Sequence, residues 1–115
     1  MTIIYHLSTR AAWQAAAAAG AYTADSLASE GFIHCSTAQQ VRATATRIFA
    51  GRTDLILLCV DSAQVGPEIR YENLEGGDNL FPHIYGPLAV AAVVAVHDFP
   101  PRDDGGFDWP PGLPL

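Results

Sequence analysis

The stretch DLILLCVD, residues 54–61, is apolar throughout between its two aspartates. A strand with one face in water alternates apolar and polar residues, so a run without alternation predicts a central strand covered on both faces. Short apolar and β-branched residues at Thr2–Leu7 and a long apolar run at Leu88–Asp98 predict two further strands. The core of the fold is therefore expected around residues 54–61.

A first helix is predicted over Arg10–Ala19, which is rich in alanine. Ser8 or Thr9 is expected to cap its start, and Gly20 to end it.

A second helix is predicted after STAQQ, residues 36–40, where each hydroxyl residue has a glutamine three positions later, as in a capping box. Gly51 is expected to end this helix. Apolar residues at helical spacing predict its buried stripe, which consists of Val41, Ala45, Ile48 and Phe49.

Other segments have weaker signals. Val65–Glu72 is predicted to be a weaker strand and Tyr22–Ser29 a loop. Glu75–Asp78, with two adjacent glycines, predicts a turn. Two prolines bracket Leu80–Pro87 and favour a fixed, irregular segment rather than a central strand.

These elements predict an α+β fold in a single domain over residues 1–99. Two main helices come early and most strands late, and the strand–helix order of a doubly wound sheet stops after Asp61. Residues 100–115 hold five of the eight prolines and three aspartates. They predict a Pro/Asp-rich tail that lies on the surface.

Composition excludes several classes of protein. The net charge is −6 and all six basic residues are arginine, which argues against a binder of double-stranded nucleic acid. The longest apolar run, Leu88–Val96, is too short to span a bilayer. The start of the chain lacks the basic and long apolar regions of a secretory signal, so we expect a cytoplasmic protein in which Cys35 and Cys59 are reduced.

Histidines are the first candidates for chemistry. His6 and His34 lie in short apolar strand-like runs, His83 lies between two prolines, and His97 ends the last strand. Burying imidazoles without partners is costly, so we expect the first three to converge on a cavity, a hydrogen-bond network or a ligand. His97 is expected to be structural.

The spacing of the residues argues against two specific kinds of site, a catalytic zinc site and a cysteine nucleophile. No histidine pair has the i, i+2 spacing of a strand chelate or the i, i+4 spacing of a helix chelate, which argues against catalytic zinc. If residues 31–36 form a strand, Phe32, His34 and Ser36 share one face and Cys35 takes the other. A Cys35 nucleophile would then lack His34 as its base.

A second group of candidates comes from the later strands. In an extended Val65–Glu72 segment, Arg70 and Glu72 share a face, where Glu72 could polarise a sugar hydroxyl and Arg70 could bind an anionic group. His83 and Tyr85 in FPHIYG, residues 81–86, would form a rigid binding lip. A surface ion pair and a structural loop are the alternatives.

Three stretches together resemble a known family. YHLS (5–8), GFIHCS (31–36) and FPHIYG (81–86) closely resemble an uncharacterised bacterial family, domain of unknown function 952. The resemblance covers nearly all of the chain up to Asp98. It implies a small single domain and no established activity.

A more distant similarity concerns the ADP-ribosyltransferase-like superfamily, because of the order strand with His, helix, Gly-led strand, helix and apolar strand. It implies a split antiparallel or mixed β-sheet, with His6 contacting a ribose of NAD and His34 in the nicotinamide-stacking position. A late carboxylate would be supplied by Glu72 or replaced by the His83 segment. Leu7 replaces the usual glycine and His34 the usual tyrosine, which favours acid–base work on a ribose or phosphate ester.

Three functions follow as expectations. The first is an enzyme, such as an ADP-ribosyltransferase-like transferase or glycohydrolase, acting on NAD, ADP-ribose-like or nucleotide-phosphate substrates without a required cofactor or metal. The second is a non-catalytic nucleotide or small-anion binding module, and the third is a domain that docks on a protein partner. The expected catalytic residues are His6, His34, Glu72 and His83, and the expected ligand-binding residues are His6, Ser8, His34, Ser36, Arg70 and Tyr85.

Overall fold

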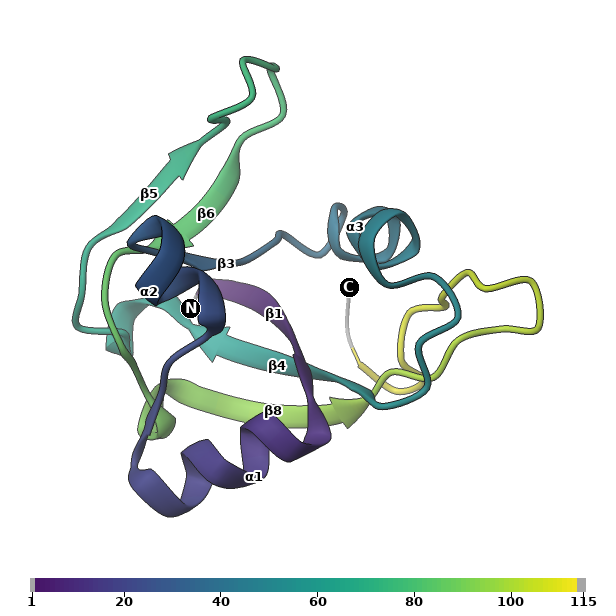
Figure 1. Ribbon diagram of the computed structural model, residues 1–115, viewed down its shortest axis with the longest axis horizontal. Coiled ribbons are helices and arrows are strands. Elements are labelled where there is room, and N and C mark those ends of the chain that lie inside the picture. The colour runs from purple at the N-terminus through teal and green to yellow at the C-terminus, as the bar shows by residue number, and fades with distance from the viewer. Residues whose placement is uncertain (1, 114–115) are drawn as a thin grey trace.

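The predicted central strand is β4, Leu55–Asp61, and all of its residues are buried. It lies between β1 (Ile3–Thr9) and β8 (Val93–Asp98) and is antiparallel to both (Figure 1). The computed structural model describes residues 2–113. Alternate side chains of β4 enter two separate cores, one on each face of this sheet, which explains why the strand has no polar alternation.

The first core lies beneath α1 (Arg10–Ala19), which has the predicted bounds. Thr9 caps the helix, because its hydroxyl oxygen accepts a hydrogen bond from the Ala12 N–H at 3.1 Å. Gly20 ends the helix with a φ of 88°, a left-handed conformation that glycine adopts without a steric cost. Trp13 packs against the core from the helix.

The second core is covered by α3 (Val41–Phe49). One half of the predicted capping box is present, since the Thr37 N–H donates to the Gln40 side-chain oxygen at 2.9 Å. Val41 and Ala45 are fully buried, as expected. Ile48 is 55% exposed, so its predicted place in the buried stripe is wrong. The helix packs along a narrow strip, and Ile48 faces a cavity instead.

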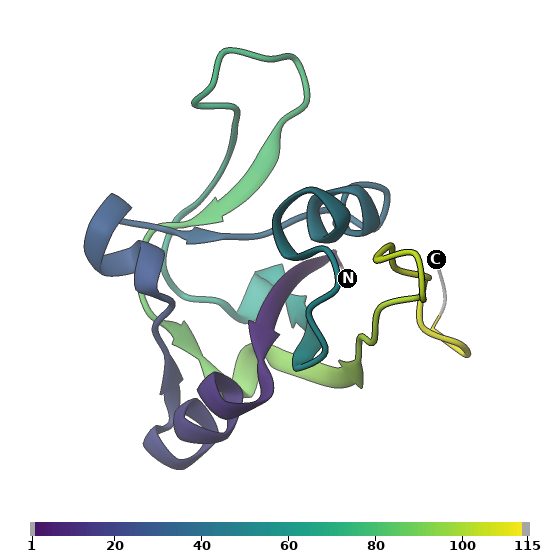
Figure 2. The ribbon, with the colours of Figure 1, turned by 45° about the vertical axis from the view of Figure 1, so that its right-hand side comes forward.

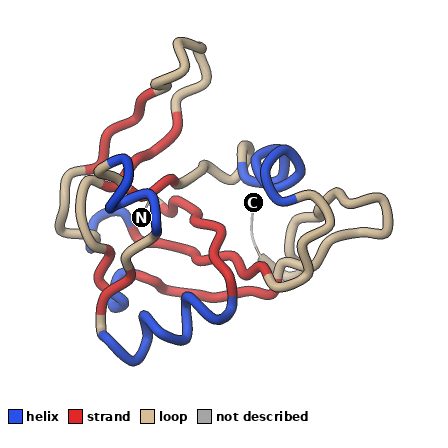
Figure 3. The backbone as a smooth tube through the Cα atoms, viewed as in Figure 1, coloured by secondary structure: helices blue, strands red, loops and turns tan. Residues whose placement is uncertain are grey.

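The segment after β8 completes the second core. Phe99 stacks on Phe107 with ring centroids 5.1 Å apart, and both rings are buried. Trp109 packs edge-on against Tyr5 of β1 at 5.3 Å. The expectation that residues 100–115 lie on the surface is wrong for Phe107 and Trp109, because apolar rings that reach a core are stabilised by burial even where the backbone is irregular. Residues 114 and 115 lie outside the described part of this segment. Figure 3 shows it as a loop beside the sheet.

A second three-stranded sheet has the order β3 (Ile33–His34), β6 (Phe81–Ile84), β5 (Ile69–Glu72). The prediction of an irregular segment at 80–87 is wrong, because β6 is the central strand here. Its Pro82 is tolerated because pairing with β3 stops there, while pairing with β5 continues through Tyr71. The Cys35 N–H donates to the Pro82 carbonyl at 3.0 Å, but proline has no N–H to return the bond and β3 ends.

Two other predictions differ from the structure. The region predicted as a loop at 22–29 overlaps β2 (Ala21–Tyr22) and α2 (Asp25–Glu30), a six-residue helix without a side-chain cap that gives little sequence signal. The run at 88–98 is divided into β7 (Leu88–Ala89), which pairs with β2, a 3₁₀ turn at Val90–Ala92, and β8. A further 3₁₀ turn at Ser62–Gln64 follows β4.

The observed fold is α+β, as predicted, in one domain. Within residues 2–113 there are three α-helices rather than two main ones, and every strand pairing is antiparallel rather than mixed. The β5–β6 hairpin projects away from the central sheet, and α3 lies on the same side of that sheet (Figures 1 and 2). No helix in this described part of the chain is both long and apolar enough to cross a membrane.

Candidate functional site

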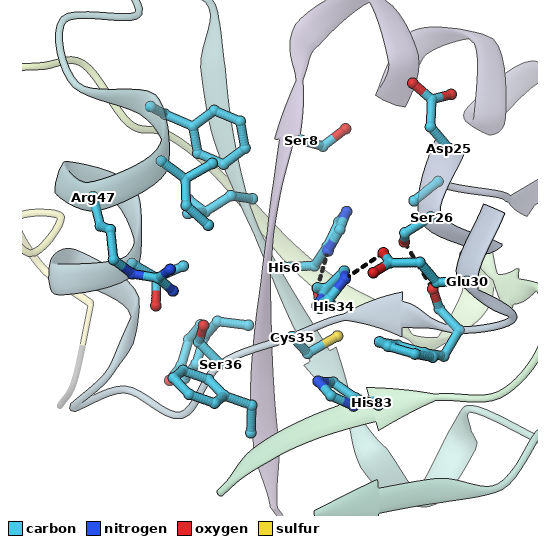
Figure 4. Close-up of a pocket in the computed structure, with 18 of the residues that line it drawn as sticks. His6, Ser8, Asp25, Ser26, Glu30, His34, Cys35, Ser36, Arg47 and His83 are labelled. Carbon is cyan, nitrogen blue, oxygen red and sulfur yellow. Dashed lines mark hydrogen bonds and ion pairs between the residues drawn. The ribbon is translucent and has the colours of Figure 1, made fainter. Parts of the chain in front are cut away.

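A cavity of 790 Å³ opens between the two sheets and α3. This volume is within the range that holds small-molecule ligands. Figure 4 shows its walls, to which α3 contributes one side and α2 and β3 the other. Six of the predicted site residues line this cavity. They come from β1, β3, β5, β6 and the segment that follows β3: His6, Ser8, His34, Ser36, Glu72 and His83.

His83 is held in one orientation inside this cavity. Its Nδ1–H donates to Oε1 of Glu72 at 2.9 Å, and Phe32 stacks on the ring with centroids 4.2 Å apart. The side chain is almost completely buried, yet it lines the cavity. Because Nδ1 carries the proton given to Glu72, neutral His83 has its lone pair on Nε2, which has no partner within residues 2–113.

Glu72 receives a second donor behind His83. The Tyr85 hydroxyl donates to the same Oε1 oxygen. These donors, the Tyr85 hydroxyl first and His83 second, lower the pKa of Glu72, and the neighbouring carboxylate raises the pKa of Tyr85. The carboxylate is therefore an ionised anchor that orients His83.

Two predicted binding residues do not line the cavity. Tyr85 contacts Glu72 from behind, and the Arg70 guanidinium lies over the Tyr85 ring at 4.3 Å while pairing with Glu68 at 2.9 Å. Arg70 and Glu72 share a face of β5, as alternation predicts, but Arg70 supports the aromatic ring that holds Glu72. Both residues therefore influence the cavity only through their effect on Glu72.

His34 lies beside His83 because the two residues are direct cross-strand partners in the β3–β6 register. Their rings meet edge to face with centroids 5.2 Å apart. The Nε2–H of His34 donates to Glu30 of α2 at 2.8 Å, and this side chain is half exposed. The cavity thus contains two neighbouring imidazoles, each held through one nitrogen by a glutamate.

His6 has a different environment from the other two rings. Its Nδ1–H donates to the His34 carbonyl oxygen at 2.5 Å, and its Nε2 lies 2.8 Å from the Tyr22 hydroxyl. Burial lowers the pKa of His6 to about 4, so the ring is neutral at pH 7. A neutral ring with its proton on Nδ1 accepts the Tyr22 proton at Nε2.

The Tyr22 hydroxyl continues this chain of contacts, since it lies 3.0 Å from the Ser8 hydroxyl oxygen. Both nitrogens of His6 are therefore occupied by the protein. His6 lines the cavity but acts on it through its neighbours, by fixing the β3 backbone at His34 and the Tyr22 hydroxyl.

Burial disfavours the thiolate form of both cysteines. Burial raises the pKa of the Cys35 thiol well above its usual range, and that of Cys59 to about 11. Neither forms a disulfide. Although Cys35 lines the cavity, a thiol that stays protonated is a poor nucleophile, which agrees with the reading of both residues as small core side chains.

Sequence reasoning missed several residues of the cavity. Tyr22 lies in the segment predicted as a loop and Glu30 directly after it, where nothing in the sequence indicated a partner for a histidine. Thr44 and Arg47 line the opposite wall from α3. Their helical spacing, three residues apart and off the apolar stripe, was the available signal.

Comparisons with known proteins agree with the fold. The crystal structure of CC0527 from Caulobacter crescentus is 36% identical, with a TM-score of 0.84 over 93% of this chain and 94% of that chain. The solution NMR structure of CC0527 is 37% identical, with a TM-score of 0.80 over 92% and 91% of the two chains. No curated protein matches the chain significantly. The family model for proteins of unknown function (DUF952) matches residues 7–96, so the chain belongs to the DUF952 family, as the motifs predicted.

Proposed function

We propose that the protein is an enzyme that acts on NAD, an ADP-ribose-like compound or a nucleotide phosphate, with His34 and His83 as its acid–base pair. One observation carries this proposal. The ring centroids of two imidazoles are 5.2 Å apart in a cavity of substrate size, and each ring is oriented by a glutamate through one nitrogen. General acid–base catalysis needs such positioned groups within reach of the reacting atoms.

The chemistry that suits the pair is hydrolysis or transfer at a phosphate ester of the ribose. His83 takes a proton from the attacking water or hydroxyl through Nε2 as the new P–O bond forms. The imidazolium of His34 gives a proton to the departing oxygen as the old P–O bond breaks. The protons then exchange with solvent, to which His34 is half exposed.

The similarity to the ADP-ribosyltransferase-like superfamily supports a nucleotide ligand. In that comparison, His6 corresponds to a ribose contact and His34 to the residue that stacks on nicotinamide. Because both nitrogens of His6 are occupied by protein groups, its role here is positioning. An imidazole at position 34 favours proton transfer over the purely stacking role of tyrosine.

A non-catalytic binding module is the second candidate, and one observation favours it. Oε1 of Glu72 already accepts from both His83 and Tyr85, so one oxygen of the carboxylate expected to polarise a ribose hydroxyl is occupied. In this case NAD or ADP-ribose binds without reacting.

The test is incubation of the purified protein with NAD, ADP-ribose and a 2′-phosphorylated nucleotide, followed by chromatographic separation of products. The proposal expects turnover of one of them, reduced about 10²–10⁴-fold in His83→Gln. His97→Gln is the matched control, since His97 does not line the cavity. Thermal stabilisation by a nucleotide without product would establish the binding module instead, and absence of both would contradict the two candidates.

A further inference from the structure

We infer that Arg47 and Thr44 form an anion subsite that holds the phosphate groups of the substrate, an inference that deepens the proposed function and rests on it. Arg47 extends from α3 toward the cavity, across from His34 and His83 (Figure 4). Thr44 lies one helical turn earlier and lines the same wall. Both residues also line a smaller hollow that adjoins the cavity at α3.

Arg47 differs from most arginines of this chain in its charge environment. Four of the six are engaged in ion pairs with carboxylates: Arg10, Arg52, Arg70 and Arg102. Within residues 2–113, Arg42 and Arg47 have no carboxylate within 4.0 Å, and Arg47 is the one of these two that lines the cavity. In a chain of net charge −6, this is a cation left available beside a ligand-sized space.

The hydrogen-bonding groups on this wall fit phosphate. A guanidinium presents several N–H donors in a planar fork that matches two phosphate oxygens. The Thr46 hydroxyl is used within the helix, where it donates to the Arg42 carbonyl at 3.0 Å. The Thr44 hydroxyl forms no hydrogen bond within the described residues, so it can donate to a third phosphate oxygen.

The rest of the cavity directs an anion toward α3. Carboxylates line the wall formed by α2 and the β5–β6 hairpin: Asp25, Glu30, Glu72 and Glu75. A diphosphate is repelled from that wall and attracted to Arg47, whereas a ribose or a cationic base is tolerated there. The ligand therefore lies with its diphosphate on α3 and with its ribose, which carries the reacting phosphate ester, beside His34 and His83. The substrate class that fits is a phosphorylated nucleotide rather than a nucleoside.

The experiment is a titration with inorganic pyrophosphate, followed by NMR chemical shifts, of the wild type, Arg47→Gln and Arg42→Gln. Arg42 lies on the same helix without lining the cavity, so its variant loses the same charge elsewhere. The inference expects Arg47→Gln to weaken binding about tenfold or more, and Arg42→Gln to change it less than twofold. Thermal melting of the three proteins reports any loss of folding or of helix stability from removing a cation in the last turn.

A second arm compares ADP-ribose with adenosine in the same proteins. Arg47→Gln should weaken ADP-ribose binding and leave adenosine binding unchanged. Equal pyrophosphate affinity in the wild type and Arg47→Gln, or an equal loss in Arg42→Gln, would overturn the subsite. If pyrophosphate binding depends on Arg47 while neither ADP-ribose nor adenosine binds, the subsite stands and the proposed function fails.

Discussion

Acidification should destabilise this protein through His6. The folded-state pKa of His6 is about 4 because the ring is buried, whereas an unfolded histidine titrates near 6.5. At a pH above the unfolded-state pKa, His6 is neutral in both the folded and the unfolded state, and its full contribution to the free energy of unfolding is present. As the pH falls from 6.5 toward 4, the unfolded state binds the proton preferentially and stability is lost. Between pH 7 and 4.5 this amounts to about 2.5 kcal/mol.

Urea denaturation at pH 7, 6, 5 and 4.5 measures this loss, with His6→Asn as the comparison. The asparagine amide does not titrate and can still donate to the His34 carbonyl. We expect the variant to be less stable at pH 7 and to lose about 2.5 kcal/mol less than the wild type on acidification to pH 4.5. Other titrating groups are common to both proteins and cancel. Parallel pH dependences of the two proteins would refute the assignment of a neutral, buried His6.

Three further predictions concern buried side chains of the fold. Tyr22→Phe leaves His6 Nε2 without its buried partner and should lower the free energy of unfolding by about 1–3 kcal/mol in urea denaturation; an unchanged midpoint would mean that the contact contributes nothing. Phe107→Ala should cost about 3–5 kcal/mol in the same assay, because Phe107 belongs to the core, and a loss below about 1 kcal/mol would place it at the surface. Cys35 and Cys59 should resist iodoacetamide at pH 8 in the folded protein and react in urea, as mass spectrometry would show; rapid labelling without urea would contradict their burial.

The central strand and the first helix were predictable because their signals are local. β4 has no polar alternation, and this property alone states that both of its faces are covered. α1 carries its own cap at Thr9 and its own terminator at Gly20, so its bounds follow from the sequence. Predicting these two elements therefore required no information about contacts distant in the sequence.

The meeting of His34 and His83 could be expected in outline but not in detail. Two prolines argued against a strand at 80–87, and only the end of β3 opposite Pro82 makes that strand acceptable. The glutamate partners of the two histidines were harder to predict, since Glu30 ends a six-residue helix without a side-chain cap. The sequence places Arg47 off the apolar stripe of its helix. Whether that face of the helix borders water or a cavity depends on the position of the second sheet.

Nucleotide binding beside His34 and His83 can be tested by a titration of the protein with ADP-ribose, monitored through the ring ¹⁵N resonances of its histidines. A nucleotide in the cavity should move the signals of His34 and His83 and leave that of His97, which lies outside it, in place. Binding in the cavity gives saturable shifts of those two rings. Rings that do not move, or a His97 signal that moves as much as theirs, would contradict it.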